Sequence, residues 1–213
     1  MTPARHLVLG MLLTAAAGFI DAVGFIELGG YFVSFMSGNT TQGGAALMDG
    51  AYPVFWLTMG LVALFFAGST LGAALAFGNL RWGPAAVSGA VLFGVGLTMA
   101  LVLAGIPASS AMLVLAAAAG AQNAILPMRG AVRLGATFVT GTLYTAGQDL
   151  ALALQGKVHR WRWLQHLAIW LGLLAGAIAG AAAYRGLGIE ALYVPIIIYA
   201  AFTLGHLWAG RTA

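Results

Sequence analysis

The chain contains no cysteine and very little charge. Only 7% of its 213 residues are Asp, Glu, Lys or Arg, and 62% are hydrophobic, whereas an ordinary soluble domain has roughly 25% charged and 45–50% apolar residues. The missing cysteines exclude a disulfide framework, a cysteine-ligated metal site and thiol catalysis. The scarce charge excludes a water-soluble single domain.

Sequence motifs of enzymes are also missing. There is no P-loop, no G-x-G-x-x-G, no G-x-S-x-G elbow and no H-E-x-x-H. The four histidines lack the spacing of a metal site and are expected mostly at the ends of spans. The nine Lys and Arg residues are scattered between apolar runs and form no basic patch. We therefore expect no enzyme, no metal site, no cofactor and no nucleic-acid partner.

Six apolar runs have the length of a transmembrane helix, which needs about 20 apolar residues. Each run is bounded by charge, Pro or Gly. The spans are expected at residues 6–27, 53–78, 84–105, 108–128, 162–184 and 189–209. The sequence therefore predicts an all-α polytopic membrane protein, with residues 1–213 forming one membrane domain in the lipid bilayer.

Two further segments, 30–49 and 131–155, carry a polar, glycine-containing middle. Each is expected to be a short extended piece, a break at Ser37–Asn39 or Thr140–Thr142, and then a short helix that a Ser or Thr oxygen caps. Their length allows either a full crossing of the membrane or a dip into it and back. They are therefore candidate re-entrant segments.

The distribution of Lys and Arg favours the re-entrant alternative. If both segments crossed, five basic residues would lie on one side and four on the other. If both re-enter, eight lie on one side and only Arg185 lies on the other, so the positive-inside rule makes the first side cytoplasmic, with both chain termini inside. The eight are Arg5, Arg81, Arg129, Arg133, Lys157, Arg160, Arg162 and Arg211.

The two halves of the chain, residues 1–106 and 107–213, resemble each other. Gly18-x-x-Asp21-Ala matches Gly120-x-x-Asn123-Ala, Ser37-Gly matches Thr140-Gly, and the glycine-rich stretch 67–74 matches 175–182. The offsets are 102, 103 and 108 residues, and the order is kept. Three crossings and one re-entrant segment in each half would give a 3+3 inverted repeat whose two breaks meet near mid-membrane, where many transporters bind their solute. Chance similarity between glycine- and alanine-rich helices is the alternative.

Asp21 is the sharpest single feature, because it lies about fourteen residues into the first span. An unpaired charge there is costly, so the carboxyl group is expected to be protonated or partnered and to face the bundle interior. It is a candidate proton-coupling group. The alternative is a structural carboxyl that binds a half-helix amide or a threonine hydroxyl.

The breaks supply further candidates for a solute site. A helix that begins at Gly38 or Gly141 exposes unpaired N–H groups that attract an anion or the polar end of a solute. Polar residues around both breaks must line protein or water; alternatively, they only cap and pack the breaks. The candidate substrate- or ion-binding residues are Asp21, Ser37, Gly38, Asn39, Thr40, Gln42, Asn123, Thr140, Gly141, Thr142, Thr145 and Asp149. Of these, Thr142, Thr145 and Asp149 are expected on one helical face.

Glycines at four-residue spacing, at 68 and 72 and at 172, 176 and 180, predict helices that approach each other closely or slide.

The stretch Gly18-Phe-Ile-Asp21-Ala-Val-Gly-Phe25, followed by Gly29-Gly-Tyr-Phe-Val33 and Met36-Ser-Gly-Asn-Thr40, resembles the opening of the YoaK-like family. The resemblance extends in length and span pattern over almost the entire chain. It implies a bacterial inner-membrane protein of a domain of unknown function, labelled in that family as a putative small-molecule transporter. It also marks Asp21, Gly38, Asn39 and Thr40 as characteristic positions. Ser37 departs from the threonine usual there but keeps the hydroxyl.

These features together predict a secondary transporter or facilitator of a small polar or anionic solute, for which Asp21 is the candidate proton-coupling group. The alternatives are a passive channel and a membrane scaffold without transport. The expected partners are the bilayer and a small-molecule or ion substrate, and a homo-oligomer is compatible with the sequence. The identity of the substrate does not follow from these residues.

Overall fold

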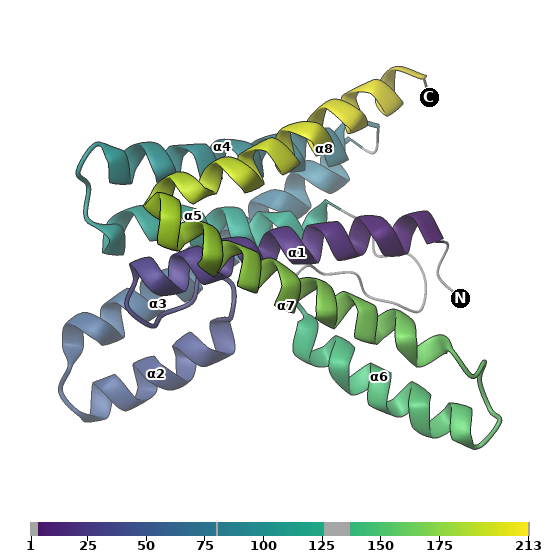
Figure 1. Cartoon of the computed structure of the whole chain (residues 1–213). Helices are drawn as coiled ribbons and strands as arrows, with labels where there is room; N and C mark the ends of the chain where they lie inside the picture. The colour runs from purple at the N-terminus through teal and green to yellow at the C-terminus, as the bar shows by residue number, and fades with distance from the viewer. Residues whose placement is uncertain (1–3, 80, 126–136, 213) are drawn as a thin grey trace.

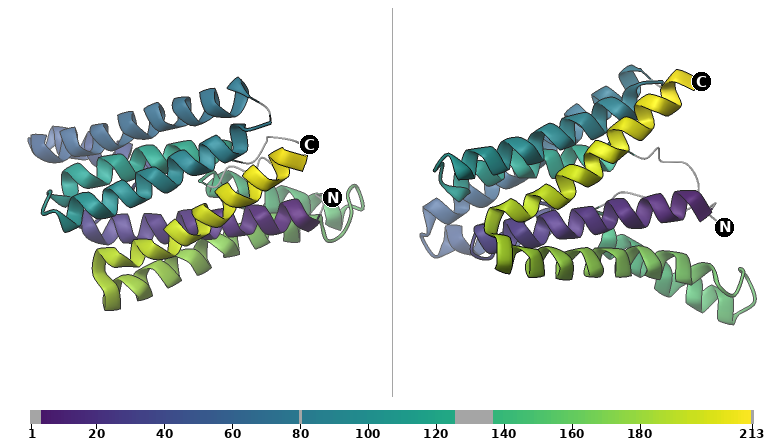
Figure 2. Two further views of the ribbon diagram at one scale, coloured as in Figure 1. Left: turned by 90° about the horizontal axis from the view of Figure 1, so that it is seen from above. Right: turned by 45° about the horizontal axis from the view of Figure 1, so that its top comes forward.

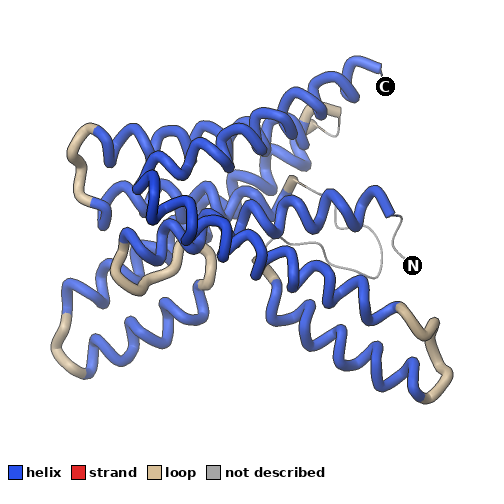
Figure 3. The backbone as a smooth tube through the Cα atoms, in the orientation of Figure 1, coloured by secondary structure: helices blue, strands red, loops and turns tan. Residues whose placement is uncertain are grey.

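The computed structural model describes residues 4–79, 81–125 and 137–212 (Figure 1). Over these residues the chain is helical and has no strand (Figure 3), which confirms the all-α class. The α-helices are α1 Ala4–Glu27, α2 Met36–Met48, α3 Tyr52–Gly78, α4 Gly83–Leu103, α5 Ala108–Ala121, α6 Val139–Leu154, α7 Arg162–Leu187 and α8 Tyr193–Thr212. Two short 3-10 helices follow α5 and α7: η1 Gln122–Ala124 and η2 Gly188–Leu192.

Four stretches of the described chain are long and apolar enough to cross a membrane. They are Leu7–Glu27, Tyr52–Gly78, Gly83–Leu103 and Arg162–Arg211. The last contains both α7 and α8, between which the chain turns at η2 (Figure 1). The expected span 108–128 contains α5 and η1 and ends outside the described residues. The count of six crossings therefore stays a prediction.

Two short helices lie in the segments expected to be broken. α2 has 13 residues and α6 has 16. The backbone at residues 30–35 before α2 is not helical, whereas most of the corresponding segment before α6 lies outside the described residues. α2 and α6 begin near the middle of the molecule and extend toward opposite ends of it (Figure 1).

The expected helix starts at the two breaks are wrong by two residues. α2 begins at Met36 and α6 at Val139, so Gly38 and Gly141 lie inside the first turn of each helix. The N-cap residues are Phe35 and Phe138, and neither N-cap makes a side-chain hydrogen bond. The Ser and Thr hydroxyls therefore do not cap these helices. The carbonyls of Phe35 and Phe138 accept the first backbone hydrogen bonds of α2 and α6.

Glycines allow the closest helix contacts, as their spacing predicts. α7 packs against α1, where a Cβ added to Gly180 would lie 2.6 Å from the carbonyl oxygen of Phe19. α5 packs against α3, where a Cβ added to Gly72 would lie 2.6 Å from the carbonyl oxygen of Ala121. Both distances are too short for a real side chain, so only glycine lets these backbones meet.

The same pattern repeats one turn earlier in each helix pair. A Cβ on Gly176 would overlap the carbonyl oxygen of Ala15, and a Cβ on Gly68 would overlap that of Ala117. The paired contacts are related by the offsets found in the sequence, 102 residues on α1 and α5 and 108 on α3 and α7. The first helix of each half thus packs on the third helix of the other.

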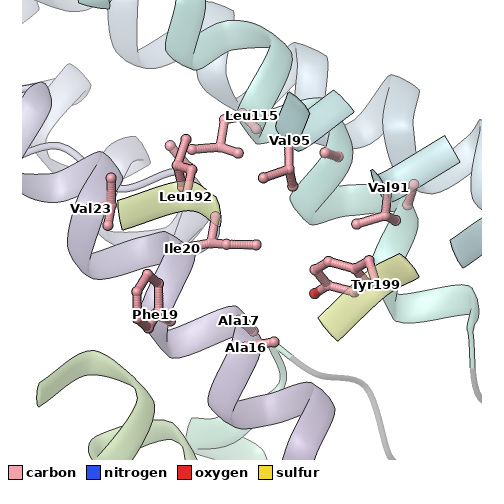
Figure 4. Close-up of a cluster of buried hydrophobic side chains, with 14 of the residues drawn as sticks. Ala16, Ala17, Phe19, Ile20, Val23, Val91, Val95, Leu115, Leu192 and Tyr199 are labelled. Atoms are coloured by element: carbon pink, nitrogen blue, oxygen red, sulfur yellow. The ribbon is translucent and has the colours of Figure 1, made fainter. Parts of the chain in front are cut away.

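A cluster of apolar side chains, mainly from α1, α4, α5, η2 and α8 with Leu61 of α3, forms the core. Figure 4 shows part of it, with Ile20 and Val23 of α1, Val91 and Val95 of α4, and Tyr199 of α8. α1 begins and α8 ends at the same end of the molecule, and α8 leans away from α1 toward that end (Figures 1 and 2).

Candidate functional site

Asp21 holds the irregular backbone that precedes α2. Its Oδ1 accepts hydrogen bonds from the backbone N–H groups of Val33, at 3.0 Å, and Ser34, at 2.8 Å. The side chain is half-buried, whereas Val33 and Ser34 are buried. Backbone that is neither helix nor strand needs partners of this kind inside a membrane. The contact accounts for a carboxyl group in the middle of an apolar helix.

Asn39 and Gln42 of α2 also form hydrogen bonds with the irregular backbone before α2. The fully buried Asn39 accepts a hydrogen bond from the N–H of Phe32 at 3.0 Å and donates one from Nδ2 to the carbonyl of Phe32 at 2.6 Å. Gln42 Nε2 donates to the carbonyl of Gly30 at 3.4 Å. Together with Asp21, these side chains satisfy successive peptide groups of the break.

Asn123 makes the corresponding contact before α6. Its Oδ1 accepts hydrogen bonds from the backbone N–H and the hydroxyl of Thr137, both at 3.1 Å. Its Nδ2 donates to the carbonyls of Ala119 and Gly120 in α5. Asn123 and Thr137 lie 102 and 103 residues after Asp21 and Ser34. The uncharged amide of Asn123 thus accepts backbone hydrogen bonds before α6, as the carboxyl group of Asp21 does before α2.

Three threonine hydroxyls of the candidate site bond to backbone carbonyls one helical turn earlier. Thr40 donates to the carbonyl of Met36, Thr142 to Phe138 and Thr145 to Gly141, at distances of 2.9 to 3.1 Å. Each donor therefore already has an acceptor four residues earlier in the chain, which leaves the hydroxyl oxygen free only as an acceptor.

The remaining residues at the breaks differ in exposure. Ser37, Thr140 and Gly141 are exposed, and no atom lies within 4 Å of the position of a Cβ on Gly141. The ring of Phe35 covers Gly38.

Asp149 lies apart from the break at the start of α6. It follows Val139 by ten residues, about 15 Å along the helix. Its buried carboxylate faces α7, where Oδ2 is 2.9 Å from Nε of Arg162 and 3.2 Å from Nε2 of His166. Thr142 and Asp149 are both buried, while Thr145 is half-buried. The structure therefore places Asp149 in an ion pair between α6 and α7.

His166 was not among the expected site residues. It lies four residues inside α7 and is 2% exposed. Residues four apart share a helical face, so the spacing of Arg162 and His166 could have indicated a common acidic partner.

A buried polar pair was also missed. The Tyr199 hydroxyl of α8 donates a hydrogen bond to Oε1 of Gln122, and both side chains are almost fully buried. Gln122 directly precedes Asn123 in the chain, but a single glutamine in an apolar stretch carries no signal of its partner.

No group of three or more His, Cys, Asp or Glu side chains in the described part of the chain could hold a metal ion.

Comparison with known proteins gives a family but no activity. The family described as "Protein of unknown function (DUF1275)" matches residues 9–205. The chain is also similar to the UPF0700 transmembrane protein RA0705 of Rhizobium meliloti (strain 1021), with 34% identity over 216 residues that cover 97% of this chain and 92% of that protein. No solved structure matches. The matches support a membrane family of unknown function, and the narrower YoaK-like assignment stays a resemblance.

Proposed function

We propose that this chain, which belongs to the DUF1275 family of proteins of unknown function, is a secondary transporter or facilitator of a small polar or anionic solute. The solute would pass near the two breaks that precede α2 and α6. Proton coupling, where it occurs, would act through Asp21. The bacterial cytoplasmic membrane is the proposed location, with both termini on the cytoplasmic side because eight of the nine basic residues are then inside.

The observation that carries the proposal is the pair of short helices that begin inside the bundle. Non-helical backbone at membrane depth is tolerated only where protein buries it or where it lines a water-filled cavity. Transporters place their solute at such broken helices. Here Asp21 and Asn123 hold the backbone ahead of α2 and α6 in matched ways, which supports a role for both breaks in one site.

The matched contacts also support an inverted repeat. The offset of 102 residues that relates Asp21 to Asn123 also relates Phe19 to Ala121, and an offset of 108 residues relates their contact partners Gly72 and Gly180. If α1, α3, α4, α5, α7 and α8 cross the membrane and α2 and α6 re-enter it, each half has three crossings, and the second half is inverted relative to the first. Movement of one half against the other along the glycine contacts would then give alternating access.

A passive channel is the second candidate, and the contacts of Asp21 favour it specifically. Oδ1 of Asp21 is already an acceptor for two backbone N–H groups, and the uncharged Asn123 serves the second break equally well. A residue that only anchors backbone needs no proton to do so. Flux without coupling would then be expected.

A flux assay on purified protein in liposomes tests the proposal. A thermal-shift screen of metabolites first finds a solute that stabilises the folded protein, because a ligand bound only by the folded state raises its apparent stability. Uptake of that solute is then measured with and without a proton gradient. For a coupled transporter, Asp21→Asn removes the effect of the gradient, while Asp49→Asn, the same change at an exposed carboxyl group beyond α2, keeps it.

The other outcomes are equally distinct. Flux that ignores the gradient and survives Asp21→Asn indicates the channel. If no solute stabilises the protein or enters the liposomes, the scaffold without transport is the better description, and Asn39→Ala and Thr142→Ala would then change stability alone.

A further inference from the structure

The buried pair of Gln122 and Tyr199 is a polar feature in an otherwise apolar part of the core. Gln122 of η1 is 1% exposed and Tyr199 of α8 is 0% exposed. Tyr199 belongs to the cluster that contains Ile20 and Val91, and Figure 4 shows its ring among those side chains. The phenol hydroxyl donates to Gln122 Oε1.

The pair retains unused hydrogen-bonding capacity. Nε2 of Gln122 is buried and has no acceptor among the described residues. The oxygen of Tyr199 has donated its only proton and can still accept. Buried amide groups in native proteins are almost always paired. The two side chains therefore present a donor and an acceptor, side by side, to a further group.

Helix packing does not require polar atoms at this place. The residues at the corresponding offsets in the first half are Ile20, 102 before Gln122, and Val91, 108 before Tyr199. Both are buried in the same core cluster, at 1% and 0% exposure. The chain thus fills the equivalent positions with hydrocarbon in one half and with amide and phenol groups in the other.

A second polar side chain lies on the same side of α8. His206 follows Tyr199 by seven residues, which is two helical turns or about 10 Å. Its Nε2 is also buried and has no partner among the described residues. From Tyr199 this line of polar groups leads toward the end of the molecule at which α1 begins and α8 ends (Figure 1).

Gln122 and Tyr199 are uncharged side chains. Asp149 is the only Asp, Glu, Lys or Arg that is buried in the described chain, and it is paired with Arg162 and His166 between α6 and α7. No Lys or Arg is buried among the residues whose exposure the structure describes, so none of these would offset the charge of an anion beside Gln122, and an unpaired charge is costly in such surroundings. An uncharged solute avoids this cost.

We infer that Gln122 and Tyr199 form a selectivity contact for an uncharged solute with both an acceptor oxygen and a hydroxyl or amide donor. The acceptor oxygen takes a hydrogen bond from Gln122 Nε2, and the donor group gives one to the Tyr199 oxygen. The inference rests on the proposed transport function and narrows its solute from polar or anionic to neutral and polar.

The test measures osmotic swelling of liposomes that contain the purified protein, with protein-free liposomes as the baseline. The uncharged probes are glycerol and acetamide, and the anionic probes are nitrate and phosphate. Wild type is expected to admit an uncharged probe faster than either anion. Gln122→Met keeps the length of the side chain and removes its amide, and Tyr199→Phe removes only the hydroxyl. Each is expected to slow entry of the uncharged probe about tenfold, the effect of one hydrogen bond.

Ile20→Val is the matched control, because it changes the corresponding apolar position, and its rate should stay close to that of wild type. Equal entry of anions, or unchanged rates in both polar variants, would overturn the inference while leaving transport standing. Wild-type rates at the protein-free baseline for all probes would instead contradict the proposed function. If Gln122→Met does not fold, Tyr199→Phe, which keeps the ring, decides.

Discussion

The close contact of α1 with α7, and of α5 with α3, allows a quantitative prediction. A Cβ placed on Gly180 or on Gly72 lies 2.6 Å from a carbonyl oxygen of the facing helix, whereas ordinary contact begins at 3.4 Å. Gly180→Ala and Gly72→Ala therefore require the helices to part by about 0.8 Å. Overpacking of this kind lowers stability by about 1–3 kcal/mol. The higher helix propensity of alanine relative to glycine offsets at most about 1 kcal/mol of this loss.

The assay is thermal unfolding in detergent, followed by the fluorescence of the six tryptophans. For a chain of about 200 residues, 1 kcal/mol changes the Tm by about 2–4 °C, so both variants should unfold several degrees below wild type. Gly96→Ala is the control, because no atom lies within 4 Å of a Cβ at that position of α4. Its Tm should equal or exceed that of wild type.

Two results would refute the reasoning. If Gly180→Ala is as stable as Gly96→Ala, the backbones of α1 and α7 do not approach as described. If Gly72→Ala and Gly180→Ala differ widely in their effect, the two helix pairs are not equivalent, and the support they give to an inverted repeat is lost.

Three further predictions concern two charged side chains, Asp149 and Asp21, and the topology of the chain in the membrane. Asp149→Asn should lower the free energy of unfolding by about 1–3 kcal/mol, since the Asp149 carboxylate is buried while its partner Arg162 is partly exposed; a double-mutant cycle with Arg162→Ala in chemical denaturation measures the coupling, and additivity of the two changes would disprove the pairing. Asp21→Ala should destabilise the protein by more than 1 kcal/mol through loss of two backbone hydrogen bonds, whereas Asp21→Asn, which keeps the acceptor oxygen, should restore most of that loss; equal Tm values for both variants would contradict the anchoring role. Single cysteines introduced as Arg81→Cys and Lys157→Cys should react with a membrane-impermeant thiol reagent from the same side of the membrane, and labelling from opposite sides would exclude the inverted repeat.

The positions of the helices follow from local features of the sequence. Apolar runs bounded by charge and glycine predicted α1, α3, α4, α7 and α8 to within a few residues, because the hydrophobic length that a helix needs is a property of one segment. The two polar interruptions correctly predicted short helices at α2 and α6. Their starts were misplaced because neither Phe35 nor Phe138 caps its helix with a side-chain hydrogen bond, so no capping residue in the sequence marks where α2 and α6 begin.

Part of the candidate site could likewise be predicted from the sequence, whereas the rest depended on the tertiary structure. The sequence alone predicted that Asp21 and Asn123 occupy corresponding places ahead of two breaks, and its spaced glycines predicted close contacts between helices. Only the tertiary structure decided that Asp21 binds the backbone of Val33 and Ser34, that Asp149 turns to α7, and that Gln122 meets Tyr199. These partners lie from 12 to 77 residues apart, and which of them meet depends on how the helices pack, whereas hydrophobicity and helix breaking act within a few turns of one segment.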